Sequence, residues 1–108
     1  LMPMIEDIQT KIANEQYEFS KHAVDQSIIR QIRLHEIVEA IANGQIIEEY
    51  PNDKYAPSCL ICGITQTGRT IHIQTSYPSR PLVKIITVYE PDPNKWNNDF
   101  TVRRKNNE

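Results

Sequence analysis

The second half of the chain alternates apolar and polar residues in a way that is typical of β-strands. Residues 69–76 and 82–90 are rich in β-branched side chains, which favour extended structure. Pro78 and Pro81 interrupt the sequence between these two segments, and proline cannot donate to a strand ladder. The pattern therefore predicts two neighbouring strands joined by a loop.

The two predicted strands have two different faces, because successive side chains of a strand point to opposite sides. The pairs Ile71/Ile73 and Ile86/Val88 are expected to face a core. The residues expected on the opposite face are His72, Gln74, Ile85, Thr87 and Tyr89. That face is either the solvated side of a half-buried sheet or the floor of a catalytic site, because His and Tyr side chains can transfer protons.

Apolar residues in the first half recur at helical spacing instead. The spacing predicts helices over residues 3–14, 21–29 and 34–43. Ser20 is a suitable N-cap for the second of these helices. Gly44 stands where a left-handed C-cap would end the third.

Two further strands are expected between the helices and the pair already described, over residues 46–50 and 58–66. Residues 67–68 would form a short hairpin turn, and a polar tail begins at about residue 97. Helices followed by strands with short connections predict an α+β fold, with N-terminal helices packed on one face of a four-stranded antiparallel sheet. The length is that of a single domain, residues 1–108.

The composition is that of an ordinary globular chain, with 39% hydrophobic and 24% charged residues. No apolar run is long enough to span a bilayer, and the N-terminus lacks the basic-then-apolar pattern of a signal peptide. We therefore expect a cytoplasmic protein that does not insert into membranes.

Cys59 and Cys62 form a C-x-x-C within a predicted strand. Residues three apart on a strand point to opposite faces, so the two thiols are poorly placed to bind one metal ion. No second cysteine pair completes a zinc site. We expect packed, reduced cysteines and neither metal nor cofactor; a redox or metal protein that uses these two thiols is the alternative.

The net charge of −2 argues mildly against avid non-specific binding of nucleic acid. The charges are unevenly distributed, however. Residues 1–68 carry five Lys/Arg against ten Asp/Glu, whereas residues 69–108 carry seven against four. A basic surface is thus expected in the half that contains His72 and Tyr89.

Short strings between residues 17 and 104 can be compared with known families: Ser20-Lys21-His22-Ala23 followed by Arg30, Gly44 to Pro51, Pro57 to Leu60, Gly68 to Ile73, Ile86 to Asp92, and Trp96. In order and spacing they resemble the bacterial domain-of-unknown-function family 4258. That family looks like a branch of the RelE/BrnT-like type II toxin superfamily. The resemblance implies a RelE-like α+β fold, an endoribonuclease that needs no metal, and a cognate antitoxin protein that masks the site.

RNA cleavage through the ribose 2′-OH requires a base, an acid and a cation on the phosphate. His22, His72 and Tyr89 are the candidates for proton transfer. Arg30 is the candidate phosphate clamp, because a guanidinium matches phosphate oxygens in pairs. Thr87 would orient the phosphate. The candidates for contacts to the rest of the RNA are Arg69, Arg80, Arg103 and Arg104.

This hypothesis requires the second helix and the later strands to meet, with His22, Arg30 and His72 within reach of one nucleotide. Neither histidine is expected in the core. The competing interpretation is a toxin-like fold that has no catalytic activity and serves as a binding or regulatory module, because a fold does not guarantee a function.

Overall fold

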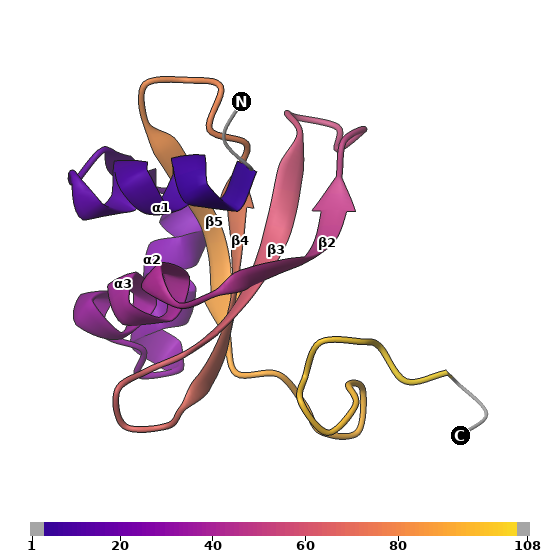
Figure 1. The fold of residues 1–108 in the computed structure, drawn as a ribbon. Coiled ribbons are helices and arrows are strands. Elements are labelled where there is room, and N and C mark those ends of the chain that lie inside the picture. Colours follow the sequence, from indigo (N-terminus) through magenta and orange to yellow (C-terminus); the bar gives the residue numbers. More distant parts are fainter. Residues whose placement is uncertain (1–3, 106–108) are drawn as a thin grey trace.

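A single five-stranded sheet forms the centre of the molecule in the computed structural model, which describes residues 4–105. The strands lie in the order β1-β5-β4-β3-β2 (Figure 1). The elements along the chain are α1 (Met4–Ala13), β1 (Tyr17–Phe19), α2 (Lys21–Ile29), α3 (Leu34–Ala42), β2 (Gln45–Tyr50), β3 (Ser58–Ile64), β4 (Thr70–Ser76) and β5 (Val83–Tyr89). The first helix was predicted to start at Pro3, which lies outside the described residues.

The predicted α+β class is confirmed, but a sheet of four antiparallel strands is wrong. β2, β3, β4 and β5 pair antiparallel as expected, and β1 adds a fifth strand parallel to β5. The flanking backbone extends the pairing, because Val83 N donates to Gln16 O at 3.0 Å and Ser20 N donates to Ile85 O at 2.9 Å. A three-residue strand whose partner lies more than sixty residues away leaves no local pattern to predict it.

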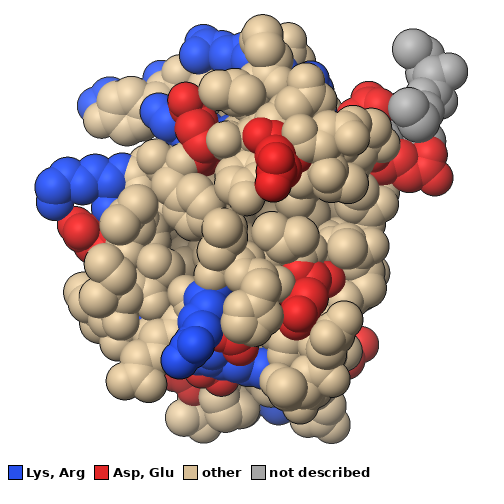
Figure 2. Space-filling view, turned by 90° about the vertical axis from the view of Figure 1, so that its left-hand side faces the viewer, with Lys and Arg blue, Asp and Glu red and all other residues tan. Residues whose placement is uncertain are grey.

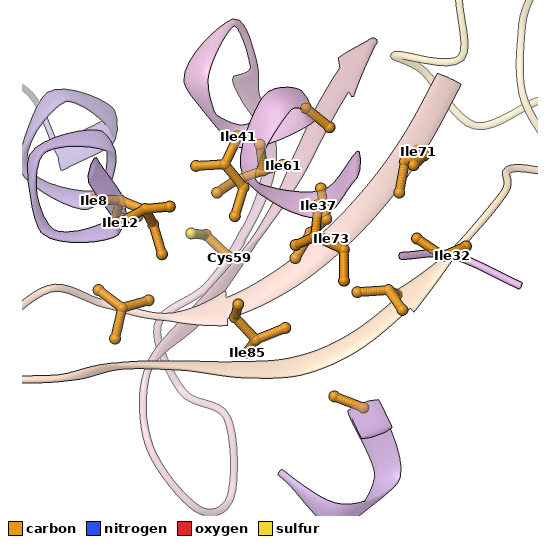
Figure 3. Packing of buried hydrophobic residues seen from close by; sticks show 14 residues of the cluster. Ile8, Ile12, Ile32, Ile37, Ile41, Cys59, Ile61, Ile71, Ile73 and Ile85 are labelled. Carbon is orange, nitrogen blue, oxygen red and sulfur yellow. The ribbon is translucent and has the colours of Figure 1, made fainter. Parts of the chain in front are cut away.

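All three helices cover the same face of the sheet, on the left in Figure 1, as predicted. Isoleucines from the helices and the sheet interdigitate between the two layers (Figure 3). The residues of this buried cluster that Figure 3 labels are nine isoleucines and one cysteine: Ile8, Ile12, Ile32, Ile37, Ile41, Cys59, Ile61, Ile71, Ile73 and Ile85. Each fully buried isoleucine contributes about 1.5–3 kcal/mol, so this layer determines how the helices sit on the sheet.

Two glycines allow α3 to approach the sheet closely. A Cβ at Gly63 would lie 1.8 Å from the backbone oxygen of Ala40, and one at Gly44 would lie 2.7 Å from the same oxygen. The prediction of a left-handed cap at Gly44 is wrong. Among the described glycines only Gly68 has a positive φ, so the backbone of Gly44 is not left-handed. Close approach of the backbones is therefore what requires glycine at position 44.

The face of the sheet away from the helices, called the outer face from here on, has the predicted alternation with one correction. The register pairs His72 with Tyr89 and Gln74 with Thr87, as expected. A bulge shifts the register between Gln74 and Thr75, and an extra residue in a bulge reverses which side chains face inward. Ile85 is consequently in the core and Ile86 lies on the outer face beside a pocket, the reverse of the prediction.

The polar tail expected from about residue 97 forms part of a compact turn beside the sheet. Residues 92–105, which we call the strap, lie beyond β5 on the side away from the helices (Figure 1). Trp96 bridges to Arg103, and Asn97 N donates to Val102 O at 2.8 Å. Trp96 is only 2% exposed, because it packs on the sheet at His72.

Within residues 4–105, no helix combines the length and the apolar character that a membrane crossing requires.

Candidate active site

His72 and Tyr89 form a hydrogen-bonded pair on the outer face. They are directly opposite each other on β4 and β5, and Nδ1 of His72 lies 3.1 Å from the Tyr89 hydroxyl. The two rings meet edge to face at 5.2 Å. Trp96 of the strap packs perpendicular to the imidazole, with 4.5 Å between ring centroids. Cross-strand pairing thus aligns the two groups, and the strap holds them together.

The strap also determines which nitrogen of His72 carries the proton. Nε2 of His72 lies 2.7 Å from the carbonyl oxygen of Phe100. A carbonyl oxygen only accepts hydrogen bonds, so the Nε2–H group donates to Phe100. In the neutral ring Nδ1 is then the acceptor, and the Tyr89 hydroxyl donates to it. Phe100 itself has φ of 62°, a left-handed conformation that is uncommon for an aromatic residue.

The protonation states of the pair follow from burial. His72 is 0% exposed, which contradicts the expectation that it lies outside the core. Burial lowers the pKa of His72, and the hydrogen bond to Phe100 only partly offsets this effect. Burial raises the pKa of Tyr89, although the charges of Arg103 and Arg30 lower it. Both groups are therefore neutral near pH 7, and Nδ1 of His72 is free to accept a proton.

A second polar cluster fastens the strap to the sheet. Nε of Arg103 donates to one Glu48 oxygen at 2.7 Å and its NH2 group donates to the other at 3.1 Å. The Tyr50 hydroxyl donates to the same carboxylate. The Arg103 guanidinium also stacks on Trp96 at 4.6 Å. The ion pair and the stacking contact therefore hold the covering residues over His72.

These contacts shift the titration of the groups in this cluster. Burial raises the pKa of Glu48, but hydrogen bonds from Arg103 and Tyr50 outweigh it and leave the pKa below its ordinary value. Burial and the bond to Glu48 raise the pKa of Tyr50 to about 12. Glu48 is thus an anion and Tyr50 a neutral donor at neutral pH.

Helix α2 lies beside the part of β5 that β1 leaves unpaired. At its start, Ser20 Oγ accepts from Ala23 N and donates to Ile86 O at 2.8 Å. At the other end of the helix, the Arg69 guanidinium donates both to the carbonyl oxygen of Arg30 and to the carboxylate of Glu90. The helix therefore runs along β5 from Ile86 to Glu90.

One flank of α2 carries both of its predicted site residues. Val24 and Ser27 face α3, because they line a shallow groove together with residues of that helix. His22, Gln26 and Arg30 recur at intervals of four residues and form the other flank. This flank is directed away from α3.

The Arg30 end of this flank lies near the C-terminal end of β5. Arg30 Nε donates to Gln26 Oε1 at 2.8 Å, and the positive charge of Arg30 lowers the pKa of Tyr89. His22 is exposed and lies eight residues earlier, about 12 Å along the helix axis. Arg30 is thus near the end of β5, because Arg69 bridges its carbonyl to Glu90, the residue after Tyr89, and His22 is at the other end of the same flank.

Thr87 lies on the outer face, opposite Gln74. It is half-buried and two residues from Tyr89, about 7 Å along the strand. The outer face accordingly brings together Thr87, Tyr89 and His72, with Arg30 at the edge.

Arg69, one of the arginines predicted to contact RNA, is occupied by contacts within the protein. Its guanidinium donates to both oxygens of Glu36 at 3.2 Å, to Glu90 at 2.6 Å and to the carbonyls of Arg30 and Gln31. Its side chain is 22% exposed. Arg69 therefore joins β4, the end of α2 and the start of α3.

The other predicted RNA-contact arginines differ from one another. Arg103 is paired with Glu48, and Arg104 donates to Pro93 O at 3.0 Å and to Asn98 Oδ1 at 3.3 Å. Arg80 is exposed in the loop between β4 and β5. Among residues 4–105 no acidic side chain forms an ion pair with Arg80.

The cysteines lie on opposite sides of β3, as the sequence predicts. Both are buried and unbonded. Cys59 is in the core, with Sγ 3.6 Å from the Thr75 hydroxyl, whereas Cys62 is paired with His72 in the register. Burial raises the pKa of both thiols, which makes them poor nucleophiles. The part of the chain that the structure describes has no group of three or more His, Cys, Asp or Glu side chains able to hold a metal ion.

Sequence reasoning missed the residues that surround His72. Glu48 and Tyr50 are two apart on a strand, which places both on one face, and this signal was available. The role of Phe100 had no such signal, because its backbone carbonyl makes the contact. A backbone atom contributed by a distant turn has no counterpart in the residue pattern.

Residues 19–90 match the model of a protein family described as Domain of unknown function (DUF4258). The match spans most of the chain, from the end of β1 to just beyond β5, and the chain therefore belongs to this family. It includes α2 and the His72–Tyr89 pair but stops before the strap. No curated protein and no solved structure matched the chain significantly.

Proposed function

We propose that the protein is the toxin of a bacterial toxin-antitoxin pair, a metal-independent endoribonuclease that cleaves RNA through the ribose 2′-OH. The observation that carries the proposal is the His72–Tyr89 hydrogen bond, whose direction is set by the Phe100 carbonyl. In this pair the Tyr89 hydroxyl is on the side where the substrate would bind, and it donates to the unprotonated Nδ1 of His72. Arg30 borders this pair, and the resemblance to RelE/BrnT-like toxins supports the choice of RNA.

In the proposed first step, the phenolic oxygen of Tyr89 accepts the proton of the 2′-OH. Tyr89 passes its own proton to Nδ1 of His72 at the same time. A tyrosine with a raised pKa is a poor base by itself, and this relay removes the need for a phenolate. The imidazolium that forms is stabilised by the nearby Glu48 carboxylate, whose charge raises the pKa of His72.

The 2′-oxygen then attacks phosphorus, and the bond from phosphorus to the 5′-oxygen breaks. Arg30 neutralises the charge that develops on the phosphate oxygens. Attack in line places the leaving oxygen on the opposite side of phosphorus, so the acid has to be a different group from Tyr89. We assign this role to His22, the remaining proton-transfer candidate, which is exposed on the same flank of α2 as Arg30. The two residues are about 12 Å apart along the helix axis, so the assignment requires both side chains to reach one phosphate. The products are a 2′,3′-cyclic phosphate and a 5′-hydroxyl.

Substitution of the two proton-transfer groups tests the mechanism. Tyr89→Phe removes the relay and leaves the ring in place, and His22→Ala removes the acid. Each variant is expected to lower the cleavage rate by about 10²–10⁴, with the fold retained by circular dichroism. Thr87→Val serves as the graded comparison, because a residue that only orients the phosphate should cost less. If Tyr89→Phe and His22→Ala both cleave at the parental rate, the mechanism is wrong.

An antitoxin protein is part of the proposal, because the producing cell must silence the nuclease. The accessible part of the outer face, around Thr87 and Tyr89, is the surface that such a partner would cover. The surface on the helix side of the molecule is mostly uncharged, with scattered acidic and basic side chains (Figure 2). A partner that inhibits cleavage but leaves Tyr89 accessible would contradict this model of inhibition.

One observation favours a second function, a non-catalytic binding or regulatory module. His72 is fully buried and both of its ring nitrogens have hydrogen-bond partners, as in a histidine that stabilises the fold. Under this alternative Tyr89→Phe lowers stability, and neither the parent nor the variant cleaves RNA.

A further inference from the structure

The outer face contains a pocket at the end farthest from the strap. Its volume is about 420 Å³, within the range of small-ligand sites. It is lined by β1, β4 and β5 and by the loops that precede β3 and β5. The lining residues that carry the argument are Ser20, Tyr55, Arg80, Lys84 and Ile86.

The pocket lies along the same strand as the candidate active site. Lys84 and Ile86 of β5 line it, and Thr87 and Tyr89 follow along the strand. At about 3.4 Å per residue, Ile86 and Tyr89 are about 10 Å apart. In double-helical DNA each strand rises about 3.4 Å along the helix axis per phosphate. The pocket and Tyr89 are thus separated by the length of a few nucleotides.

One cation of the pocket, Arg80, is available to a ligand. Neither Arg80 nor Lys84 forms an ion pair within the described residues. Of the two acids at the wall, Asp53 accepts a hydrogen bond from Ser58 at 2.9 Å, and Glu18 is opposite Lys84 in the strand register. Arg80, on the loop, is the cation left for an anionic group.

An aromatic side chain completes the chemistry. Tyr55 is 87% exposed at the pocket, with Lys54 Nζ 5.6 Å from its ring centroid. Exposed aromatic rings beside cations are the arrangement that binds single-stranded nucleic acid, with bases stacked on the rings and phosphates on the cations. The side chains of this wall therefore fit a nucleotide, with a flat base against Tyr55 and a phosphate at Arg80.

We propose that this pocket binds a nucleotide of the same RNA strand, a few positions from the bond that is cleaved at Tyr89. The base stacks on Tyr55 and the phosphate contacts Arg80. This inference rests on the proposed function for the identity of the strand. It adds a recognition subsite that the catalytic residues do not provide.

The test measures the affinity of a single-stranded 2′-O-methyl oligoribonucleotide by fluorescence anisotropy. This probe lacks the free 2′-OH and is not cleaved, so binding is measured separately from catalysis. Tyr55→Ala is expected to weaken binding by about 5- to 100-fold through lost stacking. Arg80→Ala is expected to lower the slope of log affinity against log salt by about 0.7, the loss of one phosphate contact on a single strand. The matched control is Arg33→Ala, because Arg33 is an exposed arginine that does not line the pocket.

The outcomes separate the two proposals. Parental affinity in both pocket variants, or a parent that does not bind the probe, overturns the pocket. If the parent cleaves RNA and the pocket variants bind the probe normally, the proposed function stands without this subsite. If the pocket variants bind weakly and the parent cleaves no RNA, the pocket stands and the nuclease proposal fails.

Discussion

Nε2 of His72 lies 2.7 Å from the carbonyl oxygen of Phe100, and this contact connects the sheet to the strap. In the neutral ring it makes Nδ1 the acceptor for Tyr89, and it fastens the strap over His72. The relationship predicts how stability depends on pH, how the strap controls access to the site, and how Tyr89 reacts.

His72 makes the folded protein sensitive to mild acid. Because its pKa is lower in the folded state than in the unfolded chain, the unfolded state binds more protons as pH falls through the ordinary histidine range. The contribution of neutral His72 to stability is complete above about pH 6.5 and is lost progressively below it. The free energy of unfolding by urea should therefore fall between pH 7.5 and 5.5.

His72→Gln is the control for this dependence, because it removes the titrating group and keeps a polar side chain. The fall in stability over the same pH interval should be smaller in this variant. Equal falls in the parent and in His72→Gln would show that other groups are responsible.

Trp96 keeps His72 inaccessible. Trp96→Ala removes the ring that packs on the imidazole and on which Arg103 stacks, and truncation of a buried tryptophan costs about 3–5 kcal/mol. We expect the strap to open before the sheet unfolds, because it is attached through few contacts. Carbethoxylation followed by mass spectrometry should then detect modification of His72 in the variant and little in the parent. Protection of His72 in a folded Trp96→Ala protein would contradict the role of the strap.

Two of the arginines that were predicted to contact RNA should differ in their effect on stability. Arg69 is held by contacts within the protein, whereas Arg80 forms no ion pair among the described residues. Arg69→Met leaves the poorly exposed Glu36 without its ion pair and two carbonyls without a donor. Hydrogen bonds to charged groups contribute about 1.5–3 kcal/mol each, so we expect a loss of at least about 2 kcal/mol in the free energy of unfolding. Arg80→Met is the matched comparison and should change it by less than about 0.5 kcal/mol. Similar losses in the two variants would refute the distinction.

The sequence predicts the outer face well where the two-residue period of a strand is uninterrupted. His72, Gln74, Thr87 and Tyr89 share a face because the alternation determines the register of β4 and β5. The prediction fails at Ile86, where a bulge adds a residue that the alternation does not contain. Bulges depend on how two strands meet, and one strand's pattern does not encode them.

The burial of His72 was missed for a related reason. The alternation gives the side of the sheet on which a residue lies, but does not show what covers that side. Trp96 and Phe100 lie more than twenty residues beyond His72 in the chain, and the polar composition from about residue 97 predicted only a polar tail. Trp96, the Phe100 carbonyl and the Arg103–Glu48 ion pair hold that tail over the sheet.

We propose that the protein cleaves RNA by attack of the 2′-oxygen, with proton transfer through Tyr89 and His72. The most direct measurement incubates the purified protein with a single-stranded RNA in excess chelator and identifies the new ends by mass spectrometry. The account predicts fragments that end in a 2′,3′-cyclic phosphate and begin with a 5′-hydroxyl, and no cleavage of the 2′-O-methyl oligonucleotide of the same sequence. Intact RNA, or fragments that carry a 5′-phosphate, would contradict it.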